Sequence, residues 1–277
     1  MEYRTLPDDV SYTRMNTEEL RRAFLIERLF RDDAVTMVGA SADRAIVGGA
    51  VPKGGELGLE APAGLIAAKS FLERREIGIA NIGGEGTVTA DGSRFTLRKG
   101  DILYLGRGVR DVRFGSADPG TPAAIYFVSF PAHASYPSTL VRKEDAESAT
   151  LGTAAGANRR TLRRYIHTGG ARSCQLVMGI TELQEGSVWN TMPPHTHNRR
   201  TEVYLYFSLS ADQMALHMMG RPEETRTIIV RDREAVISPP WSMHAGAGTQ
   251  AYAFVWAMGG ENQEFADMDD APVARLR

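Results

Sequence analysis

The sequence predicts a mainly β protein built from two strand-rich halves. From about residue 34 onward, short apolar runs alternate with Gly, Pro, Asp and Asn at intervals of about 8–12 residues, as in chains of many short antiparallel strands. Such runs include Ile77–Ile82, Ile102–Leu105, Ala124–Phe130, Cys174–Leu183, Glu202–Leu209 and Ala251–Met258. A polar stretch rich in small residues at 138–160 indicates a linker. We therefore expect one β domain at 36–137 and a second at 161–277.

Residues 1–35 precede this strand texture and are expected to form a helical arm. Asn16 or Thr17 can cap the start of a helix, and acidic residues follow directly, where they favour the first turn. The apolar residues of segment 20–30 then fall close to one helical face. We expect this arm to pack on a barrel or on a neighbouring subunit.

The composition excludes several classes of protein. The 277 residues are 43% hydrophobic and 24% charged, which is enough apolar content for a folded core. The net charge of -2 argues against a general nucleic-acid binder. The single cysteine, Cys174, cannot form an internal disulfide. We see no signal peptide and no apolar run long enough to span a bilayer, so we expect a cytoplasmic protein that does not engage membranes.

A set of potential metal ligands lies in the second half. His195, His197 and Glu202 have the spacing H-x-H-x4-E, and His244 follows in a distant strand. Residues i and i+2 of a strand share a face, so both imidazoles can point into a barrel. An isolated His-x-His is more often ordinary surface or core, but here three of only six histidines join one pattern. Three nitrogens and one oxygen suit Zn²⁺, and also Fe²⁺, Mn²⁺, Ni²⁺ or Co²⁺.

The first half repeats the same layout without most of the ligands. A segment of equal length again ends in a glutamate followed by an apolar run, and a strand with a tight turn recurs downstream. The residues that align with the four ligands are, in order, Lys69, Phe71, Glu76 and Asp111. We therefore predict one metal ion per chain, bound by the second half alone.

This two-part pattern resembles the motifs of the cupin superfamily. The first motif matches at His195, His197 and Glu202, although its framing glycines are out of register. The second matches at Pro239 and His244, with Trp241 in place of the usual glycine. The resemblance implies a bicupin, which is two double-stranded β-helix (jelly-roll) barrels, with the N-terminal barrel lacking metal.

A more specific resemblance surrounds the ligands. Residues 193–207, together with 81–86 and 125–129, closely resemble the 5-keto-4-deoxyuronate isomerases, also called 4-deoxy-L-threo-5-hexosulose-uronate ketol-isomerases. The resemblance implies Zn²⁺ on the four matched residues and a homo-oligomer, a hexamer. It also implies an aldose–ketose isomerase that forms 3-deoxy-D-glycero-2,5-hexodiulosonate in pectin degradation.

Five residues near the ligands are candidates for substrate binding or catalysis. Arg199 and Arg200 could clamp a substrate carboxylate, or could be solvated loop charges. Tyr204 and Tyr206 share the inward face of a strand with the ligand glutamate, where either could be an acid, a hydroxyl anchor or core packing. Trp241 could wall a sugar pocket or simply pack. The sequence leaves the choice between a general base and a hydride shift open.

Other functions fit the same fold, because fold alone does not determine function. A 5-deoxyglucuronate isomerase of inositol breakdown would keep the metal and change the pocket. A metal-dependent dioxygenase would contain iron and consume oxygen. A non-catalytic sugar sensor would usually carry a DNA-binding module, and no helix-turn-helix with a basic face is visible.

Overall fold

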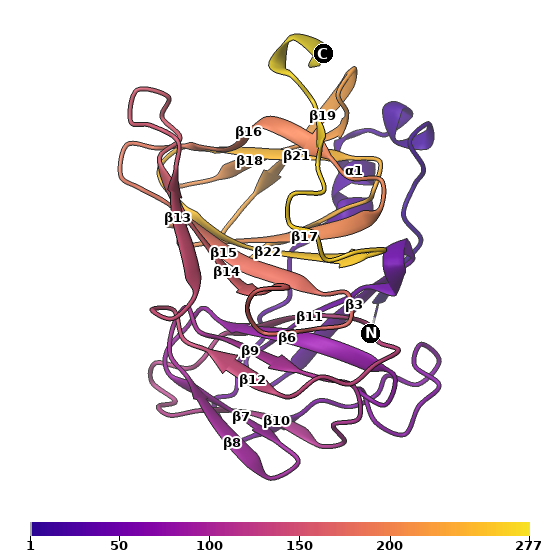
Figure 1. The fold of residues 1–277 in the computed structure, drawn as a ribbon, viewed down its shortest axis with the longest axis vertical. Coiled ribbons are helices and arrows are strands. Elements are labelled where there is room, and N and C mark those ends of the chain that lie inside the picture. Colours follow the sequence, from indigo (N-terminus) through magenta and orange to yellow (C-terminus); the bar gives the residue numbers. More distant parts are fainter. Residues whose placement is uncertain (1) are drawn as a thin grey trace. The chain divides into compact units, whose positions relative to one another are not determined.

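The computed structural model describes residues 2–277 and confirms a mainly β chain (Figure 1). The chain divides into two compact units. Unit 1 comprises residues 2–4, 28–147 and 165–178, and unit 2 comprises residues 5–27, 148–164 and 179–277. The units therefore interleave along the chain rather than following one another across a single linker.

Unit 1 contains two sheets. The larger has the strand order β1-β3-β4-β11-β6-β9-β12, and the smaller has the order β5-β10-β7-β8. The strands are β1 (Glu2–Arg4), β3 (Val35–Ala40), β4 (Ile46–Ala50), β5 (Leu57–Gly58), β6 (Arg75–Asn81), β7 (Gly86–Ala90), β8 (Ser93–Leu97), β9 (Ile102–Leu105), β10 (Val112–Ser116), β11 (Ile125–Pro131) and β12 (Thr139–Val141). A 3-10 turn, Ala42–Arg44, joins β3 to β4.

Side chains from both sheets form the core of unit 1. Phe127 of β11 stacks on Phe114 of β10 with ring centroids 5.9 Å apart. Gly48 of the neighbouring strand β4 lies directly under the Phe127 ring, and a Cβ there would lie 2.1 Å from ring atom Cζ. The large ring and the glycine are therefore a matched pair, as close packing requires.

Unit 2 also contains two sheets. The larger has the order β13-β14-β15-β22-β17-β20-β2, and the smaller has the order β19-β18-β21-β16-β23. The strands are β2 (Leu25–Ile26), β13 (Glu147–Leu151), β14 (Arg160–Ile166), β15 (Val177–Leu183), β16 (Trp189–Thr196), β17 (Arg200–Phe207), β18 (Ala215–Arg221), β19 (Glu224–Val230), β20 (Ala235–Ser238), β21 (Met243–Gly248), β22 (Ala253–Gly260) and β23 (Asp269–Asp270). The boundary between the units falls within β13, β14 and β15.

The N-terminal segment contains one short α-helix, α1 (Thr17–Phe24), rather than helix throughout residues 1–35. The predicted cap is confirmed: Asn16 accepts a hydrogen bond from the backbone of Glu19, and the Glu19 side chain accepts one from the backbone of Asn16. The helix ends where Leu25–Ile26 pairs with β20. Two 3-10 turns, Ser11–Arg14 and Val273–Arg275, complete the helical elements, and none of the helices described is long and apolar enough to cross a membrane.

The segment 138–160, expected to be a linker, contains regular structure. It includes strands β12 and β13 and the first residue of β14. The parts without strand or helix include residues 142–146, between β12 and β13, and residues 152–159, between β13 and β14. The small residues that suggested a linker lie in the second of these parts, so composition located this irregular piece but not the strands before it.

Strand β6 of unit 1 and strand β17 of unit 2 occupy equivalent places in their sheets. Strand β6 lies between β11 and β9, and β17 lies between β22 and β20. Each carries a buried glutamate near its start, Glu76 in β6 and Glu202 in β17. The strand pairing shows that the two glutamates do not match. Glu202 pairs with Ser238, the last residue of β20, whereas Ile77 pairs with Leu105, the last residue of β9. Glu76 therefore faces away from the apolar core that contains Ile77, and the predicted alignment of the two glutamates is wrong by one residue.

The other aligned positions of unit 1 differ from the histidines of unit 2. Phe71 is buried in the apolar core. Lys69 is exposed, in an irregular stretch before β6. Asp111 is exposed, whereas its neighbour Val112 is the buried residue that begins β10. Because successive side chains of a strand point to opposite faces, Val112 matches the buried His244 better than Asp111 does.

Glu76 has become a structural anchor. Its carboxylate accepts hydrogen bonds from the backbone N–H groups of residues 174–176 at 2.6–2.9 Å and from the Tyr104 hydroxyl at 2.8 Å. Burial, together with the neighbouring Glu76, raises the pKa of Tyr104, so its hydroxyl stays a donor. The glutamate thus holds segment 174–176 to the sheet of unit 1.

We predict that Glu76→Gln lowers the free energy of unfolding of unit 1 by about 2–4 kcal/mol. The amide replaces an acceptor oxygen by a donor group that faces N–H groups in need of acceptors. Urea unfolding followed by circular dichroism measures the change. Glu85→Gln, at an exposed position of the same unit, is the matched control and should change stability by about 0.5 kcal/mol or less. Equal stability of the two variants would contradict the anchoring role.

Candidate metal centre

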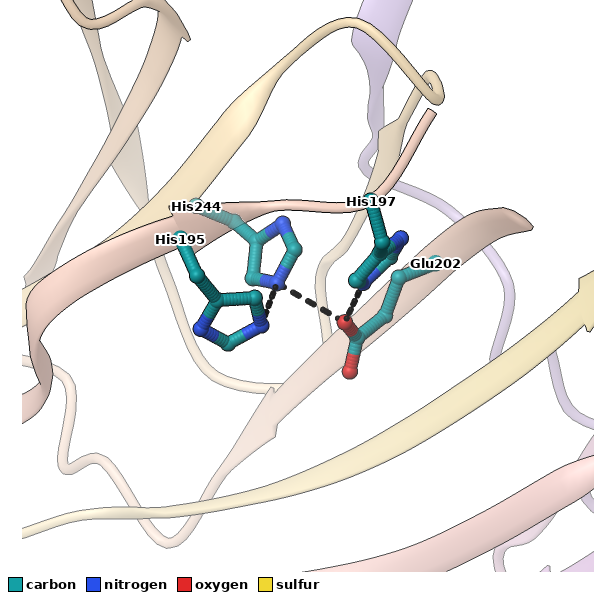
Figure 2. A group of neighbouring side chains, drawn as sticks. All are labelled: His195, His197, Glu202 and His244. Atoms are coloured by element: carbon teal, nitrogen blue, oxygen red, sulfur yellow. Dashed lines mark hydrogen bonds and ion pairs between the residues drawn. The ribbon is translucent and has the colours of Figure 1, made fainter. Parts of the chain in front are cut away.

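Strands of both sheets in unit 2 bring the four predicted ligands together (Figure 2). His195 lies in β16 opposite His244 of β21, with which it is in register. His197 follows one residue after the end of β16, and Glu202 is the third residue of β17. Figure 2 shows the four side chains pointing toward one another.

The ligand atoms are close enough to share one ion. His244 Nε2 lies 3.1 Å from His195 Nε2 and 2.8 Å from Glu202 Oε2, and His197 Nε2 lies 3.0 Å from the same oxygen. All four atoms lie within 4.8 Å of one another. Ligands at bond lengths of about 2.0–2.1 Å in a tetrahedron are about 3.4 Å apart. The donor set and its spacing therefore suit one divalent metal ion.

The buried setting gives His195 and Glu202 the protonation states that a metal needs. Burial lowers the pKa of His195 to about 3, and the neighbouring His244 acts in the same direction, so His195 is neutral. Burial alone would raise the pKa of Glu202, but His244 and His197 outweigh it and hold that pKa well below the usual range. Neutral imidazole and ionised carboxylate are the forms that bind metal.

The opposite nitrogens of two ligand rings are held by neighbouring groups. His197 Nδ1 lies 2.9 Å from the backbone carbonyl of Arg200, to which it donates, so Nε2 is the nitrogen directed at the cluster. His244 Nδ1 lies 3.3 Å from the Ser238 hydroxyl. Burial would lower the pKa of His197, but its bonds to Glu202 and to Arg200 raise it, so metal would displace a proton there.

The cluster borders a cavity of about 320 Å³, within the size range of small-molecule sites. His195, Glu202 and Tyr204 form part of its wall. The other lining residues are Leu151, Arg160, Leu162, Thr181, Thr191, Met192, Pro193, Phe254, Trp256, Met258, Phe265 and Met268. The arrangement is a mostly apolar pocket with metal-binding side chains in its wall. A metal ion held by these side chains would polarise an oxygen atom of a bound ligand.

Comparison with known proteins shows the family of the chain. The sequence profile described as the KduI/IolB family matches residues 43–275. The chain belongs to this family. A curated relative in Kineococcus radiotolerans is 51% identical over 279 residues, covering 99% of each chain, and one in Caldicellulosiruptor bescii is 50% identical over 277 residues, covering 100% of each. Both are named 4-deoxy-L-threo-5-hexosulose-uronate ketol-isomerase.

The solved structure of an IolB-like protein has a similar fold. The IolB-like protein of Salmonella typhimurium superposes with a TM-score of 0.70 at 14% sequence identity. The match covers 87% of this chain and 94% of that one. The fold is thus shared across a wide sequence distance, while the donor cluster and cavity are properties of the present chain.

The two candidate tyrosines have different surroundings. The Tyr204 ring lines the cavity, and its hydroxyl lies 3.3 Å from the Thr191 hydroxyl. Tyr206 does not line the cavity, and its hydroxyl lies 2.9 Å from Nδ1 of the fully buried His217. Gly246 leaves room for Tyr206, because a Cβ there would lie 3.0 Å from the hydroxyl. Tyr204 is therefore the tyrosine that a ligand can reach.

The two candidate arginines bind parts of the protein rather than the cavity. Arg199 forms ion pairs with Asp267 and Asp269. Arg200 is fully buried, and its guanidinium donates to the backbone carbonyls of Glu264 at 2.8 Å and Asp267 at 2.7 Å. Both arginines thereby fix the segment that carries two cavity residues. The adjacent basic pair suggested substrate binding, but sequence spacing gave no sign of these acidic and carbonyl partners.

The aromatic wall of the cavity also differs from the expected one. Trp241 stacks on Tyr12 at 4.7 Å and meets Phe24 edge-on at 6.1 Å, so it holds the N-terminal segment of unit 2. Phe254 and Trp256 line the cavity instead, together with the next alternate residue of β22. That period of two in a strand was the signal that could have found them.

We predict that His244→Ala loses bound metal while the fold survives. The variant lacks one of the four ligands, so the remaining three hold the ion more weakly. Metal content per chain, measured by inductively coupled plasma mass spectrometry, is the readout, with circular dichroism for the fold. His133→Ala, at an exposed histidine outside the cluster, is the control and should retain metal. Full metal content in the His244 variant would overturn the ligand assignment.

Proposed function

We propose that this chain is a 4-deoxy-L-threo-5-hexosulose-uronate ketol-isomerase of pectin degradation. It interconverts that sugar acid and 3-deoxy-D-glycero-2,5-hexodiulosonate by moving hydrogen between C1 and C2. The observation that carries the proposal is identity of about half the residues, across the whole chain, with relatives of that name. The cavity bordered by metal-binding side chains is the site where such a reaction can take place.

We further propose Zn²⁺ as the resident metal, held by His195, His197, Glu202 and His244. Three imidazole nitrogens and one carboxylate oxygen are a usual zinc set. When bound, the metal supplies Lewis-acid polarisation of a carbonyl oxygen. In the same proposal the chain is a bicupin, with one cupin barrel in each unit. The expected domain 36–137 lies in unit 1, most of the expected domain 161–277 lies in unit 2, and only unit 2 binds metal.

The chain's own residues then orient the sugar and move protons between its oxygen atoms. Burial and the adjacent Glu202 raise the pKa of Tyr204 well above its ordinary value, so its phenol is protonated at neutral pH. A protonated hydroxyl in the cavity wall can donate to one substrate oxygen and, through Thr191 at 3.3 Å, regain a proton. The apolar walls exclude water, which strengthens these contacts.

One combined experiment tests the function and the metal. Protein purified without added metal should contain one zinc ion per chain and convert 4-deoxy-L-threo-5-hexosulose uronate, and Lys69→Ala should leave the metal stoichiometry unchanged. The second substrate to be assayed is 5-deoxyglucuronate, the substrate of the alternative isomerase considered from the sequence. The family description, KduI/IolB, joins two names, so more than one substrate has to be tested. Turnover of 5-deoxyglucuronate alone would overturn the proposed substrate. Two metal ions per chain would overturn the single-site proposal.

We predict that Tyr204→Phe lowers kcat by about 10²- to 10⁴-fold with little change in KM, because it removes a proton donor but keeps the ring. Steady-state kinetics on the deoxyuronate measures both constants. Tyr206→Phe is the matched control: it removes a hydroxyl from the same strand that faces His217 rather than the cavity. Equal losses in the two variants would assign Tyr204 to packing rather than chemistry.

The remaining proposals follow from the family resemblance rather than from the site. We propose a homo-oligomer, a hexamer, located in the cytoplasm. Analytical ultracentrifugation of the purified chain measures the assembly directly. A monomer at micromolar concentration would contradict it.

A further inference from the structure

Arg160 is a cation in the cavity wall without an acidic partner. It begins strand β14, is partly buried, and lines the same cavity as His195 and Glu202. Among residues 2–277 it is the one arginine or lysine in that lining. Its guanidinium Nη1 donates to the backbone carbonyl of Asn158 at 2.9 Å, which uses one of five donors and neutralises no charge.

This setting is costly for a cation unless an anion joins it. Burial lowers the pKa of Arg160 more than Tyr204 and Tyr252 raise it, yet an arginine stays protonated at neutral pH. A charge that has lost part of its water gains most from a partner of opposite charge. The donors that remain form a planar fork, which matches the two oxygens of a carboxylate.

The other arginines of this region are already paired with acceptors. Arg199 has Asp267 and Asp269, and Arg200 has two backbone carbonyls. Neither lines the cavity. Among the cationic side chains near the site, Arg160 is therefore the one placed to meet a ligand.

We propose that Arg160 binds the carboxylate of the uronate substrate and thereby fixes which end of the sugar reaches the metal ligands. This inference rests on the proposed function. A uronate carries its carboxylate at C6 and its reacting carbonyl at the other end of the chain, so the two ends need different partners. The cavity wall supplies them, a guanidinium at Arg160 and a metal-binding cluster at His195 and Glu202. The lining also includes Leu162 and Trp256, whose apolar surfaces strengthen a charge pair by excluding water.

The test uses a matched pair of substitutions in one strand. Arg160→Met removes the cation from the cavity. Arg163→Met removes a cation from the same strand outside the cavity, where Arg163 pairs with Glu182. Each metal-loaded variant is assayed on 4-deoxy-L-threo-5-hexosulose uronate and on its neutral methyl ester, and its metal content is measured.

The Arg160→Met variant is expected to lose the preference of the wild-type protein for the charged acid over its neutral methyl ester. Arg160→Met should lower kcat/KM for the acid by about 10- to 100-fold, mainly through KM, and leave the methyl ester and the metal content unchanged. Arg163→Met should change neither substrate. Arg160→Lys keeps the charge without the fork, so it should retain part of the preference for the acid. Equal losses on acid and ester in Arg160→Met, or the same loss in Arg163→Met, would overturn the proposal.

A binding measurement separates this inference from the proposed function. If the wild-type protein does not turn over the deoxyuronate, the proposed function fails. Calorimetry with D-galacturonate and D-galactose then still tests Arg160, since the two sugars differ by one carboxylate. Tighter binding of the acid by wild type, lost in Arg160→Met and kept in Arg163→Met, supports the carboxylate site. No preference for the acid in wild type, or a preference that survives Arg160→Met, overturns it.

Discussion

A carboxylate removed from water must be met by donors or cations, and both units of this chain are built around one. In unit 1, backbone N–H groups and a tyrosine hydroxyl surround Glu76. In unit 2, the imidazoles of His197 and His244 surround Glu202. Glu76 faces away from the apolar core of its unit and acts as a structural anchor, whereas Glu202 belongs to the metal-binding cluster. The strands are equivalent, but the two glutamates lie one residue out of register and meet different neighbours.

Strand alternation explains how much of the site could be predicted from the sequence. A period of two places His195 and His197 on one face, and the pairing of β16 with β21 brings His244 opposite His195. Local spacing together with a known two-part pattern was therefore enough to name the cluster. The same rule placed Tyr204 and Tyr206 on one strand face but did not distinguish them, and only Tyr204 lines the cavity. It was also available for Phe254 and Trp256, which sequence reasoning passed over in favour of a tryptophan next to the motif.

The sequence did not show which groups pair with the arginine side chains. Arg199 and Arg200 lie next to the ligands in the chain, yet their partners come from residues more than sixty positions away. Arg160 lies far from the motif in sequence and borders the cavity in space. Long-range pairing of this kind depends on tertiary packing, and no local periodicity encodes it. The same limit applies to the N-terminal segment, where pairing of Leu25–Ile26 with β20 ended the helix early.

Arg200 contacts both the metal-binding cluster and a segment of the cavity wall, so substitutions that alter one of these parts also affect the other. Its backbone carbonyl orients the ring of His197, and its guanidinium holds the segment that supplies Phe265 and Met268 to the cavity wall. Substitutions that reshape this wall to accept a different sugar acid would also disturb His197, a member of the metal-binding cluster. Selection for substrate range and selection for metal retention therefore act on one residue. Substitutions at Leu151 and Leu162 are less constrained, because these cavity residues do not belong to the metal-binding cluster.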